Sequence, residues 1–550
     1  MNEPLASGAA QMIAASFRRQ AARREAADPT LAENLGLGLQ LLRERGFVAA
    51  APQLALEAAG EVSGQPAEAN TEKILACGIV ASGPGPRSLV VLDRGLLYFR
   101  INWEMECDLA ARLAERVLAP TKPHRRKPPP PSELSINQQR AFEEIFRGDL
   151  TLVTGGPGTG KTTLVGHVID RWVEQGGNPD HVLLTAPTGR AAARLAGAVK
   201  GRIDAELPAA RTLHRALGFS PGRGRFLRDE FSPLTAELVV VDEVSMVDLD
   251  LMHALLRALP AGARLVLLGD PNQLASVQPG SVIRDICEGL AGGRGESRVV
   301  NLTENFRFGD DSGIARLADA VVAGNPRQAR TVVADSGDDL VWHSQLPVAD
   351  DLLPGWLSDP PDSLDEHWQR LQSRRLLCAH RRGPYGVERL NRQIGAALAP
   401  AADGFFAQQL LSVVGNHYES GFYNGDQGFV RLTERGLLAY FEQPDGDIRQ
   451  ISLSRVPTAD TAFALTVHRA QGSEFGEVHF VLPDTTSPLL SRELIYTAIT
   501  RAKNRLHIHG TLEALERGIN KVSERGSGLA GRLKDLTRPH SDAPIQQSLF

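Results

Sequence analysis

Hydrophobic positions follow one pattern before residue 119 and another after residue 131. Residues 1–118 have mostly helical spacing, except that residues 88–100 (S-L-V-V-L-D-R-G-L-L-Y-F-R) place two apolar runs on either side of Asp93, Arg94 and Gly95. This arrangement predicts a β-hairpin. Because no group of residues in this part has catalytic spacing, we expect residues 1–118 to form an accessory domain that docks a partner.

From residue 132, short apolar runs alternate with amphipathic helices, which is typical of a parallel sheet covered on both faces. The strands predicted in this first α/β domain, residues 132–335, are 150–154, 181–186, 238–241 and 264–268. Ligands bind such sheets at the carboxyl ends of the strands. A binding site is therefore expected along that edge.

The α/β pattern resumes in a second domain, residues 336–535, with strands predicted at 375–379, 462–466, 477–482 and 505–509. Within it, residues from about 405 to 455 change to short strands joined by turn dipeptides such as Asn-Gly and Asp-Gly. These features predict a small β-barrel insert. Residues 536–550 are polar and are expected to form a flexible tail.

Two further stretches interrupt the regular pattern. Residues 119–131 contain four consecutive prolines, which exclude a helix and favour a stiff linker. The basic residues of this linker either are simply solvated or touch a phosphate backbone; they are Lys122, Arg125, Arg126 and Lys127. Residues 218–231 are rich in arginine and glycine and predict either a protruding hairpin or a plain surface loop.

Composition narrows the class of protein. The 550 residues are 42% hydrophobic and 23% charged, with a formal net charge of −5, so any contact with nucleic acid must be local. No apolar run approaches the ~18 residues that span a bilayer, and we predict a cytoplasmic protein without membrane contact. The four cysteines lie far apart without C-x-x-C spacing, which gives no sign of a cysteine zinc site or a disulfide framework.

The most informative motif is G-G-P-G-T-G-K-T at residues 155–162, which lies between an apolar run and a stretch of helical spacing. In that context it predicts a phosphate-binding loop, where backbone N–H groups and a helix dipole surround a polyphosphate. Lys161 is expected to reach the outer phosphates of ATP, and the Thr162 hydroxyl to bind Mg²⁺. The predicted nucleotide-binding residues of this loop are Gly155, Gly156, Pro157, Gly158, Thr159, Gly160, Lys161, Thr162 and Thr163.

Polar residues that end later strands complete the predicted hydrolytic site. V-V-V-D-E ends in Asp242, predicted to hold the metal, and Glu243, predicted to be the general base. L-L-G-D-P-N-Q-L places Gln273 where it can sense the γ-phosphate. Phosphoryl transfer also needs cations against the developing charge, and the candidates are Arg307 and Arg501.

Eight motifs follow one another along the chain: G-G-P-G-T-G-K-T, T-A-P-T-G-R-A-A, T-L-H-R-A-L-G, V-V-V-D-E-V-S-M-V-D, L-L-G-D-P-N-Q-L-A-S-V-Q-P-G, L-T-E-N-F-R, T-V-H-R-A-Q-G-S-E-F and Y-T-A-I-T-R-A. In this order they resemble the motifs of superfamily 1 helicases over residues 134–510, and among those helicases the RecD family, the alpha subunit of bacterial exodeoxyribonuclease V (RecBCD). Residues 90–106 and 377–391 are also similar to blocks of that family.

The resemblance implies two RecA-like parallel-sheet motor domains, a mainly helical N-terminal domain, an SH3-like β insert and a pin hairpin at residues 218–231. It assigns Gln139 to the adenine, and places Arg307 and Arg501 on opposite sides of an interdomain cleft. Gln471 and Glu474 would link this cleft to a track for single-stranded DNA. The motif residues that would line the track are Thr188, His214, Ser276, Thr466 and His468. Bases also stack on aromatics in such tracks, and the candidates are Phe219 and Tyr423.

The leading hypothesis is an ATP-dependent 5′ to 3′ DNA helicase that acts on single-stranded DNA and duplex ends with RecB-like and RecC-like partners in a heterotrimer. The alternatives are a stand-alone RecD-like helicase and an ATP-gated assembly scaffold. No extra cluster of carboxylates and lysine suggests a nuclease site, so cleavage is expected in a partner. The terminal Q-Q-S-L-F, from Gln546 to Phe550, resembles a sliding-clamp peptide, with a frayed terminus as the alternative.

Overall fold

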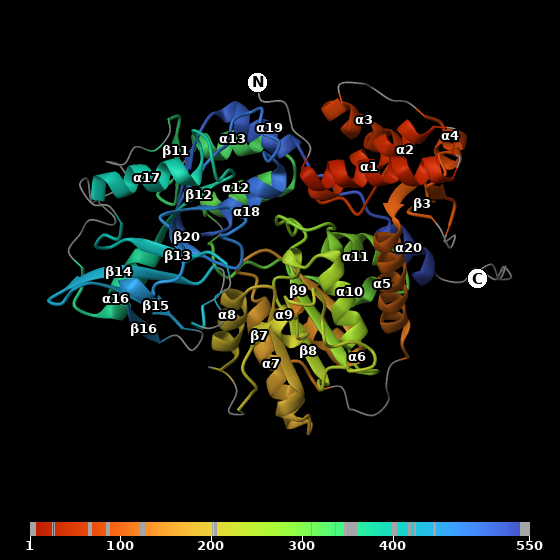
Figure 1. Ribbon diagram of the computed structural model, residues 1–550. Coiled ribbons are helices and arrows are strands. Elements are labelled where there is room, and N and C mark those ends of the chain that lie inside the picture. The colour runs from red at the N-terminus through yellow and green to blue at the C-terminus, as the bar shows by residue number, and fades with distance from the viewer. Residues whose placement is uncertain are drawn as a thin grey trace.

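The computed structural model describes residues 7–538, apart from residues 25, 27, 64–68, 84–87, 121–127, 201, 203–205, 310, 336, 346, 348–359, 399–403, 416, 418–419, 423–424 and 444–446. The basic linker residues, Tyr423 and the terminal peptide from Gln546 to Phe550 lie outside the described residues. The predictions made for them stay predictions. Figure 1 shows the N-terminal helices above a first α/β lobe on the right, and a second lobe with its insert on the left.

The N-terminal part is mostly helical and carries the predicted hairpin. Its helices are α1 (Gly8–Arg23), α2 (Pro29–Glu44), α3 (Pro52–Ser63), α4 (Thr71–Ala76) and α5 (Arg100–Leu118). Its four-stranded sheet has the order β1-β4-β3-β2, formed by β1 (Ala49–Ala50), β2 (Val80–Ala81), β3 (Val90–Asp93) and β4 (Leu96–Phe99). Strands β3 and β4 pair antiparallel across Arg94 and Gly95, both with positive φ, as a tight two-residue turn requires.

The first lobe is built on a six-stranded parallel sheet of order β10-β5-β9-β8-β6-β7. Its strands are β5 (Leu150–Thr154), β6 (Val182–Ala186), β7 (Arg211–Thr212), β8 (Leu238–Val241), β9 (Arg264–Gly269) and β10 (Val299–Asn301). Its helices are α6 (Ile136–Arg147), α7 (Lys161–Glu174), α8 (Gly189–Lys200), α9 (Leu213–Ala216), α10 (Leu249–Ala258) and α11 (Val282–Leu290). The four predicted strands are confirmed.

Both faces of this sheet are buried, which explains why its strands are continuous apolar runs. Within β8, Leu238 and Val240 belong to one core, whereas Val239 and Val241 belong to another. Successive side chains of a strand point to opposite faces, so each face has its own layer of helices. The polar motifs lie at the carboxyl ends of these strands, as predicted.

The second lobe contains a five-stranded parallel sheet of order β11-β20-β19-β12-β18. Its strands are β11 (Leu340–His343), β12 (Arg374–Cys378), β18 (Ala464–Thr466), β19 (Phe475–Val481) and β20 (Ala502–His509). Its helices are α12 (Gly313–Val322), α13 (Pro326–Ala334), α16 (Leu364–Gln372), α17 (Val387–Leu398), α18 (Arg492–Ile499) and α19 (Leu512–Asn520). The four strands predicted for this domain are also confirmed.

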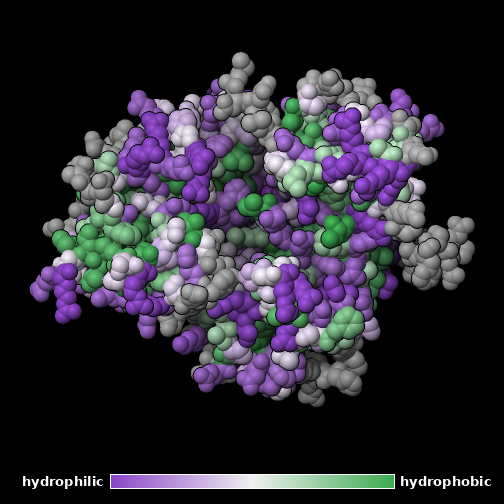
Figure 2. Space-filling view, viewed as in Figure 1, coloured by the Kyte–Doolittle hydropathy of each residue, from purple (hydrophilic) through white to green (hydrophobic). Residues whose placement is uncertain are grey.

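The predicted β insert is present as an antiparallel sheet of order β16-β15-β14-β13-β17. Its strands are β13 (Leu410–Val413), β14 (Gln427–Thr433), β15 (Gly436–Glu442), β16 (Ile448–Ser452) and β17 (Ala459–Thr461). The insert therefore extends a few residues beyond the expected end at about 455. Figure 2 shows hydrophobic surface gathered over this part of the molecule, where Leu432 is 64% exposed.

Both domain boundaries predicted for the motor differ from the structure. Helices α12 and α13 fall within the predicted first domain, but Leu317 and Val332 pack in the core of the second lobe. Helix α20 (Leu529–Thr537) was expected in the second domain, but Leu533 packs in the first lobe, and α20 lies beside α5 in Figure 1. The reason is physical: an amphipathic pattern shows that a helix is buried, but not against which sheet.

The chain therefore passes between the lobes twice, at residues 303–312 and at residues 521–528. The second passage is anchored to both lobes. The Ser523 N–H donates to Glu493 of α18, and Arg525 donates to the Ser276 carbonyl of the first lobe, at 2.9 and 2.5 Å.

The N-terminal part is packed onto the first lobe, although α1–α4 and the small sheet also enclose a hydrophobic core of their own. Residues of α5 and α20 share one core with the first sheet. At this junction the fully buried Glu106 accepts hydrogen bonds from the Tyr98 hydroxyl (3.1 Å), the Ser527 hydroxyl (2.9 Å), the Gly528 N–H (3.1 Å) and the Arg532 guanidinium (3.1 Å). The predicted accessory domain is thus fixed to the motor through the C-terminal helix.

Candidate functional site

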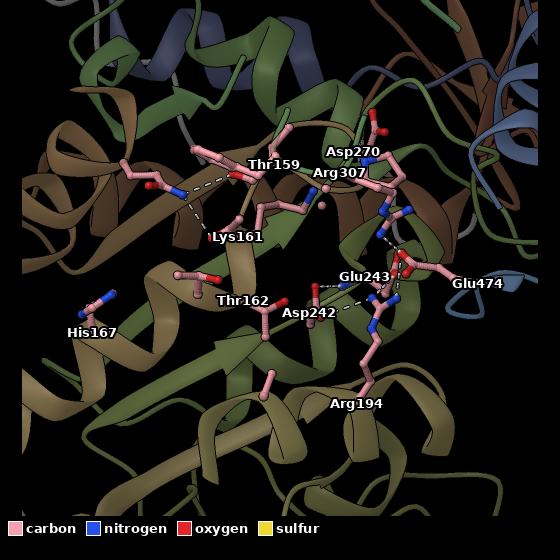
Figure 3. A pocket seen from close by; sticks show the side chains of 18 of the residues that line it. Thr159, Lys161, Thr162, His167, Arg194, Asp242, Glu243, Asp270, Arg307 and Glu474 are labelled. Atoms are coloured by element: carbon pink, nitrogen blue, oxygen red, sulfur yellow. Dashed lines mark hydrogen bonds and ion pairs between the residues drawn. The ribbon is translucent and has the colours of Figure 1, made fainter. Parts of the chain in front are cut away.

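The glycine-rich loop lies between β5 and α7, at the carboxyl edge of the first sheet, as predicted. It lines a cavity of about 740 Å³ together with residues from both lobes (Figure 3). Gly160 has a φ of 77°, and a Cβ at this position would lie 2.4 Å from the Gln138 amide nitrogen. A Cβ at Gly156 would lie 2.9 Å from the Tyr496 hydroxyl of the second lobe. Glycine is therefore needed at both positions, for different reasons.

Lys161 begins α7 and its side chain folds back over the loop. Its Nζ donates to the carbonyls of Gly155 and Gly156, at 2.5 and 2.8 Å. Burial lowers the pKa of Lys161, although the carboxylates of Asp270, Asp242 and Glu243 oppose this shift. The ammonium group thus stands at the mouth of the phosphate loop, in the position that a polyphosphate would reach.

Asp242 and Glu243 follow β8 and face the loop across the cavity. Glu243 has a left-handed backbone, with a φ of 55°, and its N–H donates to the Asp242 carboxylate at 2.8 Å. A left-handed conformation at a residue other than glycine costs on the order of 1–3 kcal/mol and is typical of functional sites. Burial and the neighbouring Glu243 raise the pKa of Asp242. For Glu243 burial acts in the same direction, but the cations of Arg194, Arg501 and Lys161 outweigh it and lower its pKa.

Arg194 of α8 contacts both of these acids, and we did not predict it. Its guanidinium donates to Glu243 at 2.7 Å, lies 3.8 Å from Asp242 Oδ2, and lies 3.4 Å from Glu474 of the second lobe (Figure 3). No sequence motif singles it out, because the contact depends on how α8 packs over the sheet. The residue therefore bridges the acid pair of one lobe and a carboxylate of the other.

Glu474 is the meeting point of the two lobes inside the cleft. Arg307, in the segment that connects the lobes, donates to it at 2.6 Å, and the Lys503 ammonium lies 3.7 Å away. Burial would raise the pKa of Glu474, but Arg307 and Arg194 lower it to about 2. Glu474 therefore keeps its negative charge at every physiological pH. It pairs with the guanidinium groups of Arg307 and Arg194, which would otherwise face the cavity.

Arg501 and Gln273 also line the cavity, as expected. Arg501 is buried, and it donates to the carbonyls of Thr497 and Ser473 at 3.2 and 3.3 Å. Gln273 donates to Asp270 at 3.2 Å, and its carbonyl oxygen has no hydrogen-bond partner among the described residues. Asp270 also accepts the Tyr496 hydroxyl at 2.9 Å, so the second lobe touches the strand end that carries Gln273.

The glutamine that lines the cavity is Gln138, one residue before the predicted Gln139. Gln139 was assigned to the adenine, but its amide donates to the Leu134 carbonyl at 2.7 Å and it does not line the cavity. Gln138 lines the cavity instead and donates to the Thr159 carbonyl at 3.3 Å. A step of one residue turns a helix by about 100°, which separates the two side chains. The capping box formed by Ser135 and Gln138 was a sequence signal for this position.

A further aromatic residue borders the cavity. Phe306, next to Arg307, is 63% exposed and lines the cavity near Gly160. An exposed ring at the edge of a nucleotide cavity offers a surface on which a base can stack.

The residues predicted for the DNA track lie on both lobes, and those from T-A-P-T-G-R and H-R-A-Q-G meet. A Cβ at Gly472 would lie 3.4 Å from the Thr188 hydroxyl, and the Gln471 amide donates to the Leu274 carbonyl at 2.6 Å. Thr466 and His468 are partly exposed on the same lobe as Gly472. Ser276 is buried, and its hydroxyl donates to the Gln278 carbonyl at 2.9 Å, so in this conformation it offers little surface.

The stretch at residues 218–231 forms a bridged loop without regular strands. Its isolated bridges join Ser220 to Arg225 and Asp229 to Ser232. At its base the rings of His214, Phe219 and Phe226 form a cluster with centroids 5.2 to 5.9 Å apart. The track candidate His214 and the stacking candidate Phe219 are therefore in contact with each other.

Comparisons with known proteins agree with this architecture. The chain matches the AAA domain over residues 138–279, in the first lobe, and the UvrD-like helicase C-terminal domain over residues 461–509, in the second. The RecBCD enzyme subunit RecD of Mycolicibacterium smegmatis is 39% identical over 434 residues, which are 72% of this chain and 75% of that protein. The same subunit of Mycobacterium tuberculosis is 38% identical over 487 residues, 82% of each chain. The chain belongs to the RecD family.

More distant members of the comparison extend beyond RecBCD subunits. The ATP-dependent RecD2 DNA helicase of Deinococcus radiodurans is 31% identical over 417 residues, which are 73% of this chain but 52% of that protein. Among solved structures, the Pif1 helicase of Candida albicans aligns over 73% of this chain and 99% of its own, with 18% identity and a TM-score of 0.44. Within the described residues, no helix combines the length and apolar character needed to cross a lipid bilayer.

Proposed function

We propose that this chain is an ATP-driven 5′ to 3′ DNA helicase that acts as the RecD subunit of a RecBCD-type helicase–nuclease on double-strand DNA ends. The observation that carries the proposal is a nucleotide cavity walled by both lobes, with Lys161 and Glu243 on one side and Glu474 and Arg501 on the other. A nucleotide bound there contacts both lobes, so its binding and hydrolysis change the distance between them. Such alternation moves a strand that the two lobes grip in turn.

The chain's own residues supply most of the hydrolytic chemistry. Lys161 leaves the loop carbonyls and binds the outer phosphates, while Gln138 and Phe306 lie where the adenine would be bound. Glu243 takes a proton from the attacking water. Arg307 and Arg501 stabilise the charge that develops on the γ-phosphate, which requires Arg307 to leave Glu474.

The residues predicted to bind magnesium fit that ion. Asp242 Oδ2 is buried and accepts no hydrogen bond from the described residues, and the Arg194 guanidinium lies 3.8 Å away, so this oxygen can still accept a metal ion. Asp242 and Thr162 both line the cavity. Mg²⁺ bound with ATP at these oxygens would shield the phosphate charge.

We also propose that Arg194 restrains the general base until the DNA track is occupied. Helix α8 begins directly after Thr188, whose hydroxyl accepts a hydrogen bond from the Ala191 N–H at 3.2 Å, and Arg194 lies on its second turn. One helix thus joins a track residue to the partner of Glu243. DNA at Thr188 can shift α8 and draw Arg194 away from Glu243.

Several finer assignments rest on the family. The antiparallel insert corresponds to an SH3-like module, the bridged loop at residues 218–231 to a pin, and the 5′ to 3′ direction to that of RecD-like helicases. The relatives named RecBCD subunits support RecB-like and RecC-like partners. A stand-alone helicase is the second candidate because of the RecD2 relative, although this chain spans about half of that protein.

The experiment that tests the motor is a Lys161→Gln substitution in the complex of this chain with RecB-like and RecC-like partners. Unwinding of 5′-tailed duplexes and DNA-stimulated ATP hydrolysis by the chain should fall at least about 100-fold, since a phosphate-binding cation is lost. Lys200→Gln, at the exposed end of α8, is the matched control and should leave both rates unchanged. Equal unwinding by the Lys161→Gln complex would leave only the ATP-gated scaffold. Failure to co-purify with the partners would favour the stand-alone helicase.

A further inference from the structure

A row of histidines crosses one face of the second sheet, away from the nucleotide cavity. His343 lies on β11, His507 and His509 on β20, and His479 on β19, which are adjacent strands of that sheet. His479 is paired with His507 in register, and their rings stack with centroids 4.3 Å apart. Glu477 precedes His479 by two residues and points to the same face.

Three atoms at one end of this row have the spacing of metal ligands. Glu477 Oε1 lies 3.0 Å from His479 Nε2 and 3.2 Å from His507 Nε2. Around a tetrahedral Zn²⁺ with bonds of roughly 2.0 Å, neighbouring ligand atoms lie about 3.3 Å apart. The other oxygen of Glu477 accepts from Arg374 at 2.7 Å, which leaves Oε1 for the site. The two stacked rings need only tilt toward a shared ion.

Counting hydrogens along the row identifies a missing positive charge. His509 Nδ1 faces the Gln345 carbonyl at 3.3 Å, and a carbonyl can only accept, so Nδ1 carries the hydrogen. The Nε2 of a neutral His509 is then an acceptor, and His479 Nδ1, 3.1 Å away, must donate to it. A neutral His479 consequently presents a lone pair at Nε2 to the Glu477 carboxylate, which is also an acceptor.

Two acceptors at 3.0 Å require a cation between them. A third hydrogen on one of the rings would supply this charge as an imidazolium, and a bound metal ion is the alternative that the ligand spacing favours. A metal ion removes the conflict with both rings neutral. It also serves His507, whose Nε2 lies 3.2 Å from Glu477 Oε1 and whose Nδ1 lies 3.0 Å from His343 Nε2.

We propose that Glu477, His479 and His507 bind a divalent transition metal ion, for which Zn²⁺ is the best fit. Two imidazoles and one carboxylate leave a fourth position for water. His509 and His343 would hold the two ligand rings in the required tautomer through their second nitrogens, as outer partners of metal-bound histidines do. The site is independent of the nucleotide chemistry proposed above.

The position of the site indicates what the ion would do. Strand β19 begins directly after Glu474, and β20 begins directly after Arg501, so the two strands carry the second lobe's side of the nucleotide cavity. An ion held by Glu477 and His479 of β19 and by His507 of β20 joins these strands through side chains. It would stabilise the second lobe against unfolding.

The test uses the full chain, stripped of metal with a chelator and then titrated with Zn²⁺. Bound metal measured by mass spectrometry after gel filtration should reach about one ion per chain, with a raised unfolding temperature, since ligand binding to the folded state stabilises it. Co²⁺ in place of Zn²⁺ should give the visible absorption of a site with nitrogen ligands. Glu477→Gln, which keeps the size of the side chain, should weaken binding at least about 100-fold.

The matched control is His181→Gln, which removes an exposed histidine 3.1 Å from Glu237 in the first lobe and should leave binding unchanged. A His479→Gln chain, which lacks one of the two imidazole ligands, should also bind Zn²⁺ more weakly. If it fails to fold, the comparison of wild type with Glu477→Gln still decides. Equal Zn²⁺ binding by these two chains, or no binding by the wild type, would overturn the proposal. The row must then hold an imidazolium.

Discussion

Substituting Arg194 by alanine should release the general base and uncouple ATP hydrolysis from DNA. The Arg194 guanidinium donates to Glu243 at 2.7 Å and lowers its pKa, both of which make Glu243 a poorer base. The same guanidinium holds Glu474 of the second lobe at 3.4 Å. Loss of the arginine therefore removes two restraints at once.

The size of the effect follows from the bond to Glu243. A hydrogen bond to a charged group contributes about 1.5–3 kcal/mol net. The Arg194 side chain is 35% exposed, so solvent screens the pair and the lower end of that range applies. A barrier lowered by about 1.4 kcal/mol corresponds to a roughly tenfold faster reaction. The DNA-free ATPase rate should rise about tenfold, while the rate at saturating single-stranded DNA stays nearly constant.

The assay measures steady-state ATP hydrolysis with and without a single-stranded oligonucleotide, together with the unfolding temperature. Lys200→Ala is the control on the same helix and should keep the wild-type ratio of the two rates. A parallel fall of both rates in Arg194→Ala would refute the reasoning, because Arg194 would then act as a cation on the γ-phosphate. A wild-type chain without any DNA stimulation would instead contradict the proposed function itself.

Three further predictions test other parts of the structure. Phe306→Ala should raise the KM for ATP about tenfold with kcat unchanged, since base stacking contributes about 1–3 kcal/mol, and Phe306→Tyr should restore it in the same steady-state assay. Burial raises the pKa of Asp285 to about 7, so the wild-type protein loses stability as pH rises from about 4 through 7 and this carboxyl group ionises. In urea unfolding, Asp285→Asn should have the same free energy of unfolding as wild type at pH 4 and a higher one at pH 8, by up to about 4 kcal/mol. Glu106→Gln should lower the free energy of unfolding by about 2–3 kcal/mol, because the buried Arg532 loses one of its two carboxylate partners and keeps only Asp93, at 2.6 Å. An unchanged free energy of unfolding would show that the charge of Glu106 does not stabilise this junction.

The elements that the sequence predicted well are those with strong local patterns. Strands such as β5 and β8 are continuous apolar runs because both faces of their sheet are buried, and both have the predicted bounds. Strands β7, β10 and β11 are two to four residues long and were not predicted. So few residues contain too little of the alternation to distinguish a strand from a loop.

The residues of the candidate site also differ in whether a local pattern predicts them. The residues of the glycine-rich loop, Asp242 and Glu243 lie at the ends of strands with strong local patterns, and they were predicted from short motifs. Arg194 enters the site through the packing of α8 against the sheet, which no local pattern records, and Tyr496 lies in the motif Y-T-A-I-T-R-A but its contact with Asp270 depends on how the two lobes meet. Gln139 was misassigned because the sequence alone does not show which of two adjacent glutamines faces the cavity. The direction of the helix places only Gln138 there.

The return of the C-terminal segment to the first lobe limits how the lobes can move. A rigid body attached to another at two separate points rotates only about the line through these points. The second lobe is therefore expected to rotate about the axis through its two connecting segments. The eight residues from 521 to 528 span at most about 28 Å when extended. The anchors at Ser523 and Arg525 leave a single residue between the lobes there, which fixes one end of the axis. The nucleotide-driven closure that we propose is therefore expected to be a rotation of set direction and not a sliding of one lobe past the other.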